Sequence, residues 1–220
     1  YLLEKLKAKL TIKFLGLNIP IKKTFYKSIY GPTLKNKTGF YSVRTPSTTN
    51  INAIEQWWRM NKARSFTEFY TALEMKALPG YNIGYADKND TIFYISNGKI
   101  PMRAEGYDWT DVVPGNTRKT LWDSYYDIKD LPQVISPKSG FVYNANHSPF
   151  KSSGAADNPQ AENFAKEMQY ETYDNNRSTR LLQLLEEKEH IDYKRFKRIK
   201  YDHQLPTPLQ YNYMDLNALF

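Results

Sequence analysis

The feature that most constrains this sequence is a set of strand patterns in its first 45 residues, joined by turns of only a few residues. Residues 9–14 read Lys-Leu-Thr-Ile-Lys-Phe, so polar and apolar side chains alternate as they do on a half-buried strand. Further strands are expected over 19–29 and 40–44, with a turn at Tyr30-Gly31-Pro32. Parallel neighbours need crossover connections of about a dozen residues or more. The sequence therefore predicts an antiparallel sheet.

The hydrophobic period changes from two to about 3.6 after the polar stretch 46–50, which predicts helices. The first helix is expected over 51–63, and its apolar side carries Ile51, Ile54, Trp57 and Trp58. The second is expected over 66–76, because residues 65–68 read Ser-Phe-Thr-Glu, a capping-box pattern. The two tryptophans could line an acyl pocket, but aromatic residues at helical spacing favour the core.

The rest of the chain mixes strand, loop and helix patterns. Residues 81–87 and 91–96 predict a hairpin, and residues 161–168, 176–190 and 192–200 predict helices. The fold class is therefore α+β, with antiparallel sheets and packed helices. We treat 1–220 as a single segment in this order: strands over 1–45, helices over 51–77, core strands and a long loop over 79–150, and helices over 160–200.

The stretch 141–150 is the main candidate for chemistry. Phe141-Val142-Tyr143 has strand composition, and the run then breaks at Asn144-Ala145-Asn146-His147-Ser148-Pro149. One interpretation is an Asx-rich turn that closes a strand. The other is an amide donor on a rigid support, because the NH2 group of Asn can donate to a developing negative charge without titrating. Both interpretations remain open on spacing alone.

Several function classes have no support in the sequence. Cysteine is absent, which excludes disulfides, thiolate catalysis and Cys-type zinc sites. The three histidines lack metal-ligand spacing, and no Ser or Asp is placed to make His147 part of a dyad. The net charge of +8 is spread as solvated lysines, so no nucleic-acid partner is expected. No apolar run approaches the roughly 18 residues of a membrane helix, so no membrane partner is expected either.

Residues 79–150 carry an ordered set of short motifs: Tyr81-Asn82-Ile83-Gly84-Tyr85-Ala86-Asp87, Gly98-Lys99-Ile100-Pro101-Met102-Arg103, Gly106-Tyr107-Asp108, Val113-Pro114-Gly115, Asp130-Leu131-Pro132-Gln133-Val134 and Ser139-Gly140-Phe141-Val142. In order and spacing this set resembles the nucleophile-bearing chain of the penicillin amidase (penicillin acylase) family of N-terminal nucleophile hydrolases. Weaker similarity extends back to Tyr30-Gly31-Pro32, where the family more often has His-Gly-Pro, and forward to Arg177. The resemblance implies part of a four-layer αββα sandwich.

The resemblance also implies hydrolysis of a linear amide. Such enzymes use the hydroxyl of an N-terminal Ser as nucleophile and its own amino group as base. Nothing near Tyr1 matches that Ser, so we expect the nucleophile outside this chain. The implied substrate is an N-acyl compound: a penicillin, an N-acyl homoserine lactone or an acylated peptide. The alternative is a catalytically inactive relative that binds acylated ligands or has a structural role.

Two residues of this sequence match the family's catalytic positions. The Asn that holds the oxyanion together with a backbone N–H falls at Asn146. The Arg near the nucleophile's amino group falls at Arg177, although the segment between the two is longer here than in penicillin acylase itself. For Arg177 a solvated arginine at a helix start is the alternative.

The remaining expectations also come from the resemblance. No cofactor is required, but some family members hold a structural calcium ion, whose ligands fall here at Asp157 and the carbonyl of Trp109. The expected partners are the alpha chain and the remainder of the beta chain, as a heterodimer from one precursor. We also expect a bacterial protein, periplasmic or secreted, that matures from a zymogen by autocatalytic cleavage.

Overall fold

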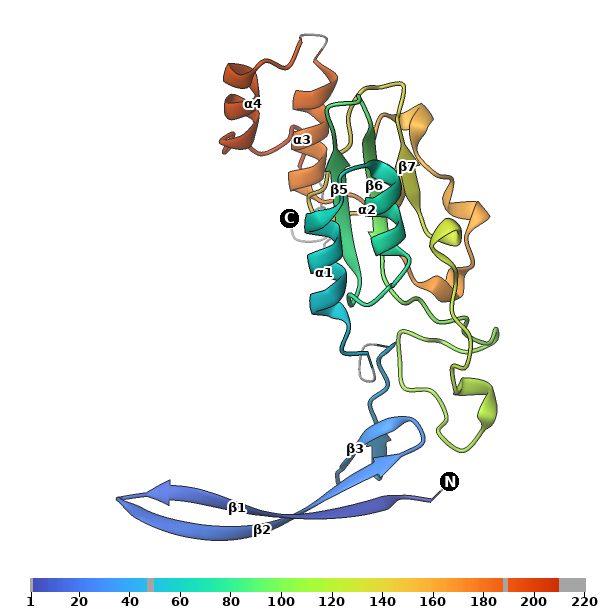
Figure 1. Cartoon of the computed structure of the whole chain (residues 1–220). Helices are drawn as coiled ribbons and strands as arrows, with labels where there is room; N and C mark the ends of the chain where they lie inside the picture. The colour runs from blue at the N-terminus through green and yellow to red at the C-terminus, as the bar shows by residue number, and fades with distance from the viewer. Residues whose placement is uncertain (1, 47–49, 188–189, 210–220) are drawn as a thin grey trace, which may run out of the picture.

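The computed structural model describes residues 2–46, 50–187 and 190–209. In these ranges it has two antiparallel sheets and four α-helices (Figure 1). The N-terminal sheet forms an arm that extends away from a body built on the second sheet (Figure 1). The predicted α+β class with antiparallel sheets is therefore confirmed.

The N-terminal sheet has four strands where the sequence predicted three. Its order is β1 (Glu4–Phe14), β2 (Leu17–Ser28), β3 (Gly31–Lys35) and β4 (Phe40–Ser42). The predicted turn at 30–32 is wrong in extent, because β3 already begins at Gly31, which pairs with Ser28. Gly31 has a φ of 134°, and a Cβ there would lie 2.4 Å from the Val43 carbonyl oxygen. Glycine therefore lets β3 start with only two residues between it and β2.

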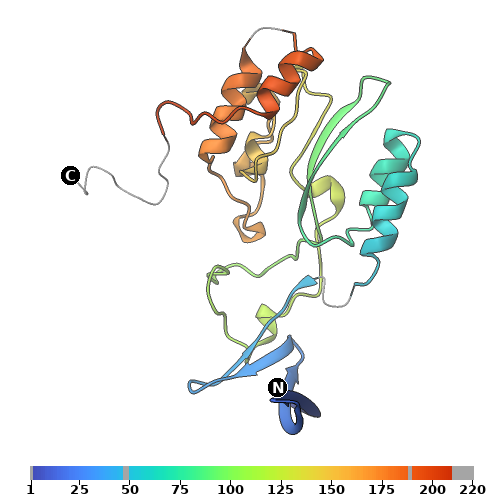
Figure 2. The same ribbon diagram turned by 90° about the vertical axis from the view of Figure 1, so that its left-hand side faces the viewer.

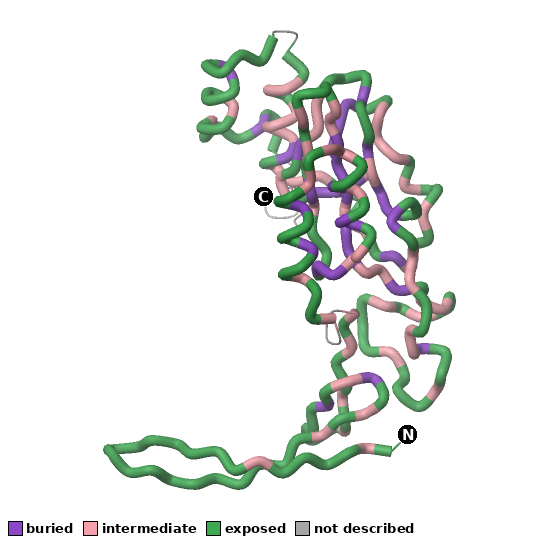
Figure 3. Tube along the Cα trace, in the orientation of Figure 1, coloured by how far each residue is buried: buried purple, intermediate pink, exposed green. Residues whose placement is uncertain are grey.

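The β1–β2 hairpin is a long amphipathic ribbon. Directly paired residues share a face, so the pairs Leu10 with Ile21 and Ile12 with Ile19 lie on one side. Lys9 and Lys22 pair on the other side. Ile12 is 51% exposed and Ile19 43%. Figure 3 shows the ribbon exposed along nearly its whole length. Its apolar face is therefore uncovered by the described part of the chain.

The second sheet forms the centre of the body. Its order is β5 (Tyr81–Ala86), β6 (Ile92–Asn97) and β7 (Gln133–Ile135), so the predicted hairpin is confirmed. Figure 2 shows α1 (Ala53–Lys62) and α2 (Phe66–Leu73) on one side of this sheet and the C-terminal helices on the other. The predicted cap of α2 is present, since the Ser65 hydroxyl accepts the Glu68 N–H. The core lies between the sheet and helices α1 and α2, where Leu73, Phe93 and Ile95 are fully buried.

Helix α1 does not bury its two tryptophans. Trp57 is 44% exposed and Trp58 60%, so the prediction that they belong to the core is wrong for this chain. The buried residues of α1 are Gln56 and Met60. Met60 packs in the core, and Gln56 bonds to backbone beyond α2. The sequence pattern located an apolar face correctly, but the described chain leaves most of that face exposed.

The loop between β6 and β7 joins the two sheets. It contains short 3-10 turns at Arg118–Thr120 and Ile128–Asp130. The Trp122 ring contacts two guanidinium groups, those of Arg44 at 5.4 Å and Arg103 at 5.3 Å from the ring centroid. Arg44 also donates to the Trp122 carbonyl at 2.7 Å. Because Arg44 directly follows the first sheet, these contacts attach the arm to the body.

The C-terminal part is less helical than predicted. Residues 161–168 form two 3-10 turns, Ala161–Asn163 and Lys166–Met168, and not one helix. Two further 3-10 turns span Pro149–Lys151 and Ala155–Asp157. Helices α3 (Asn176–Glu186) and α4 (Tyr193–Lys200) follow. Helix α3 ends before the predicted residue 190, and Arg195 of α4 donates to the Leu184 and Glu187 carbonyls at this end. Among the described residues, no helix is long and apolar enough to cross a membrane.

Candidate active site

The candidate stretch is a loop and not the end of a strand. Phe141-Val142-Tyr143 was expected to be a strand, and this is wrong, since the three residues have no strand structure. The Tyr143 N–H bonds instead to the Ser152 carbonyl at 2.9 Å, which closes a loop over 143–152. A segment of strand composition forms a strand only when a partner strand lies beside it. The last strand before this segment, β7, already ends at Ile135. The rigid support of Asn146 therefore comes from side chains and a helix.

Asn146 lies in the middle of this loop, in a left-handed backbone conformation with a φ of 53°. Asparagine is among the few residues that adopt this conformation at low cost. The Asn146 N–H donates to the Asn144 side-chain oxygen at 3.0 Å, and that oxygen also accepts from Asn82 of β5 at 3.1 Å. The Asx turn is thus real, and it is tied to the central sheet.

The start of α3 holds the other side of the Asn146 backbone. Asn175 is the N-cap of α3, and its side-chain oxygen accepts the Ser178 N–H at 3.0 Å. Its NH2 group donates to the carbonyls of Ala145 and Asn146, both at 3.0 Å. The sequence analysis missed this role. Asparagine before a helix signals a cap, but the pattern does not show which loop the cap reaches.

Arg177 is the residue that contacts the Asn146 side chain. Its guanidinium donates to the Asn146 side-chain oxygen at 3.2 Å. This bond orients the amide, so its NH2 group is left as the donor toward an incoming group. A cation in the first turn of a helix is unfavourable for the helix dipole, so Arg177 does not serve to stabilise α3. The structure therefore brings the two predicted catalytic residues together on the exposed side of the loop.

The carboxylate of Asp157, one of the two predicted calcium ligands, has other partners. Both carboxylate oxygens of Asp157 accept backbone N–H groups, from Lys138 at 3.0 Å and Ser139 at 2.8 Å. These bonds lower the pKa of the Asp157 carboxyl. Trp109 packs beside Arg103 and Trp122. Within the described ranges no cluster of three or more His, Asp or Glu could hold a metal. Asp157 and Trp109 alone are too few for calcium, which takes about six to eight oxygen ligands, so the ion remains a prediction.

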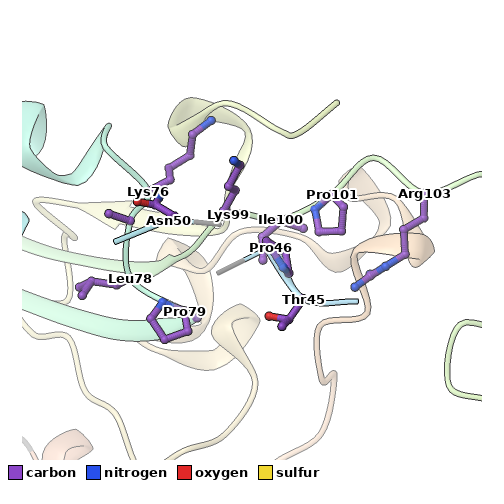
Figure 4. A pocket seen from close by; sticks show the side chains of 12 residues that line it. Thr45, Pro46, Asn50, Lys76, Leu78, Pro79, Lys99, Ile100, Pro101 and Arg103 are labelled. Atoms are coloured by element: carbon purple, nitrogen blue, oxygen red, sulfur yellow. The ribbon is translucent and has the colours of Figure 1, made fainter. Parts of the chain in front are cut away.

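Hollows also lie elsewhere in the described chain. The hollow in Figure 4, of about 160 Å³, has Lys76, Lys99 and Arg103 in its wall. Lys76 and Arg103 already donate to the carbonyls of Tyr126 and Glu167, so these cations are used in packing. A second hollow of about 320 Å³ lies between α1, α2 and β5, lined by Trp57 and Tyr81 and reaching Asn82. Asn82, which lines this hollow, donates to the Asn144 side chain of the Asn146 loop.

Comparison with known proteins places the chain in a family. The model of the penicillin amidase family matches residues 6–210. Penicillin G acylase from Escherichia coli is 30% identical over 138 residues, which cover 61% of this chain and 16% of that protein. A 115-residue stretch is 24% identical to acetyl-coenzyme A synthetase from Dictyostelium discoideum, covering 51% of this chain and 17% of that protein.

The fold comparison agrees with the family match. A thermostable penicillin G acylase from Alcaligenes faecalis superimposes with a TM-score of 0.70 at 19% identity, over 90% of this chain and 34% of that chain. The chain thus spans about a sixth of the E. coli relative and about a third of the solved structure. Because the family model covers nearly all of its length, the chain belongs to the penicillin amidase family.

Proposed function

We propose that this chain supplies Asn146 and Arg177 to the active site of an acylase that hydrolyses the linear amide of an N-acyl substrate, with the N-terminal Ser nucleophile outside the chain. The observation that carries the proposal is the bond from Arg177 to the Asn146 side-chain oxygen. It occupies the side-chain oxygen, so the two N–H groups are the part of the amide that remains for a substrate. A donor held in this way needs no reorganisation when charge develops on the substrate.

The mechanism assigns one task to each residue. Attack of the Ser hydroxyl on the amide carbonyl forms a tetrahedral oxyanion, and the free amino group of the Ser takes the proton. A terminal amine has a pKa of roughly 7.7 to 8.0, which suits a base near neutral pH. Asn146 donates to the oxyanion from its NH2 group. Arg177 keeps that group oriented while the acyl-enzyme forms and while water hydrolyses it.

The first test uses the full-length protein and a panel of penicillins, N-acyl homoserine lactones and acyl peptides. We expect the panel to release free amine with a preference for one acyl class, and we expect the mature nucleophile subunit to begin with Ser on N-terminal sequencing. Absence of released amine, with another residue at that N-terminus, would instead indicate an inactive relative that binds acylated ligands or has a structural role.

Arg177→Ala is expected to lower kcat roughly tenfold, the effect of losing one exposed charge-assisted hydrogen bond. KM should change less than about twofold, because the bond orients a group that acts mainly on the transition state. The control is Arg198→Ala, which removes an exposed arginine from α4. Equal kcat values for Arg177→Ala and wild type would show that Arg177 is only a solvated arginine at a helix start.

We also propose that other chain segments of the same protein cover the hairpin and α1. The hairpin has a continuous apolar face, and α1 exposes Ile54 and Trp58. Monomeric proteins rarely expose such large apolar faces to water. The relatives in these comparisons are about three to four times longer than this chain, so they contain segments that could supply the cover.

The double variant Ile12→Thr/Ile19→Thr tests this cover. In the full-length protein we expect it to lower the free energy of unfolding by roughly 2 to 3 kcal/mol, because two covered side chains lose apolar contact. In the segment alone we expect a change below about 0.5 kcal/mol, because both residues are exposed. The control is Lys9→Thr/Lys22→Thr on the opposite face. Equal losses in both proteins would contradict the proposed cover.

A further inference from the structure

His147, next to the proposed oxyanion donor, is buried and has no role in the chemistry described above. Its side chain is 3% exposed. The Ala145 N–H donates to its Nδ1 at 3.1 Å, and its Nε2 lies 2.8 Å from the Lys151 carbonyl oxygen. The imidazole ring therefore connects the residue before Asn146 to the far end of the same loop.

These two bonds define the protonation state of the ring. A carbonyl oxygen can only accept, so Nε2 must carry the proton that it donates to Lys151. A backbone N–H can only donate, so Nδ1 must present its lone pair to Ala145. Only the neutral Nε2–H tautomer satisfies both bonds. A second proton on Nδ1 would face the Ala145 N–H, and the bond would be lost.

The ring is also fixed on its face. It stacks on Tyr143 with a centroid separation of 4.7 Å and an interplanar angle of 21°. Tyr143 is itself bonded through its N–H to Ser152. The ring thus closes the loop over 143–152 from inside, and Asn146 with its left-handed φ lies on the closed segment. A change at the ring is transmitted to Asn146 through one residue, Ala145.

Burial and charge act together on this ring. Burial lowers the pKa of His147 below its usual value of 6.5, and the positive charges of Lys151 and Arg177 act in the same direction. The Lys151 carbonyl and the carboxylate of Asp174 oppose the shift. Lys151 pairs with Asp174 at 2.8 Å, which reduces the effect of both charges. The ring is therefore neutral near pH 7, in agreement with the tautomer that the two bonds require.

We infer that neutral His147 is a positioning residue for Asn146, and that its protonation opens the loop and displaces the oxyanion donor. This inference rests on the proposed function, because it assigns a pH response to the same site. Stability should follow the same direction. Since the folded protein binds this proton less readily than the unfolded chain, stability should fall as the pH falls from above 6.5 through the folded pKa.

The test measures kcat and KM of the full-length protein from pH 4.5 to 8.5 for two variants that each keep half of the ring's bonding. His147→Asn can keep an acceptor for the Ala145 N–H but does not titrate. His147→Gln can keep a donor to Lys151 but loses that acceptor. We expect His147→Gln to lower kcat roughly tenfold at pH 7.5 with KM within about twofold, because the donor is misplaced. We expect His147→Asn to keep most of the wild-type kcat.

The acidic part of the plot of log kcat against pH distinguishes positioning from a merely structural role. In the wild type two groups must be deprotonated, the terminal amine and His147, so log kcat should approach a slope of about two at low pH. His147→Asn leaves only the amine and should reduce the slope to about one. His190→Asn, a change at an exposed histidine, should retain the wild-type slope. A slope that stays the same in His147→Asn, or a wild-type kcat in His147→Gln, would overturn the inference.

Hydrogen exchange separates this inference from the proposed function. At pH 7 we expect His147→Gln to speed deuterium uptake in the peptide that covers 143–152 at least tenfold, while the β5–β6 peptides retain wild-type rates. This result would support the role of His147 in closing the loop over 143–152 even if the wild-type protein released no amine, which would be a failure of the proposed function alone. Equal uptake in wild type and His147→Gln would overturn that role whatever the activity.

Discussion

Asn146→Ala in the full-length protein is expected to lower kcat by roughly a hundredfold to a thousandfold, the loss measured when one oxyanion donor is removed from a hydrolase. KM should stay within about twofold, since the donor acts on charge that develops only in the transition state. The structure gives the reason for so large an effect. Arg177, Asn144 and Asn175 all bond to Asn146, so its NH2 group is held in place before the substrate arrives.

The backbone of Asn146 calls for a second variant. Alanine at a φ of 53° costs roughly 1 to 2 kcal/mol, so Asn146→Ala changes both the side chain and the loop. Asn146→Gly removes the same side chain but keeps the left-handed conformation at little cost. We expect both variants to lose kcat to a similar extent, with a loss of thermal stability only in the alanine variant. Recovery of kcat in Asn146→Gly would show that loop geometry, and not donation, is responsible.

A control asparagine is available on the same part of the chain. Asn163 is exposed and lies in a separate 3-10 turn, so Asn163→Ala should leave kcat unchanged. Asn146→Asp adds a further comparison, because it preserves the shape of the side chain but removes both donors. Its kcat should fall at least as far as that of Asn146→Ala. Activity of Asn146→Asp near the wild-type level would contradict an oxyanion role.

The sequence predicts that Asn146 and Arg177 belong to one site, and it could do so only through the family resemblance. The two residues are 31 positions apart, and no local period or spacing links them. Asn175 and His147 were missed as supports for a different reason. Each of them bonds mainly to backbone groups of the loop, and a backbone N–H or carbonyl is the same whatever residue carries it. A bond of that kind leaves no paired pattern of side chains in the sequence.

The fold could be predicted where a local pattern decides it, as in the hairpin of β5 and β6 and the Ser65 cap. Prediction failed where the structure of a segment depends on which other segment packs against it. Phe141-Val142-Tyr143 has strand composition but finds no partner strand. Trp57 and Trp58 lie on a real apolar face of α1, but both stay exposed, and the Trp57 ring only meets the Tyr81 ring at an edge. A period identifies the face of an element and does not identify its neighbour.

The period also fails to predict the burial of Gln56, because this polar residue is fully buried in α1. Its side-chain oxygen accepts the N–H groups of Ala77 at 2.6 Å and Leu78 at 3.2 Å, where the chain leaves α2. Its NH2 group donates to the Asn97 side-chain oxygen at 3.2 Å. Asn97 in turn donates to the Leu73 carbonyl at 3.1 Å. One glutamine therefore connects α1 to the end of α2 and to the end of β6.

Gln56→Leu should consequently destabilise the fold by roughly 3 to 5 kcal/mol. Two buried backbone N–H groups lose their acceptor and Asn97 loses its donor, and each unsatisfied buried group costs about 1 to 3 kcal/mol, offset in part by the apolar gain of leucine. Urea unfolding followed by circular dichroism measures the change. The control is Gln183→Leu on the exposed side of α3, which should change stability by less than about 0.5 kcal/mol. If the two variants were equally stable, the Gln56 bonds would not be what joins α1 to the central sheet.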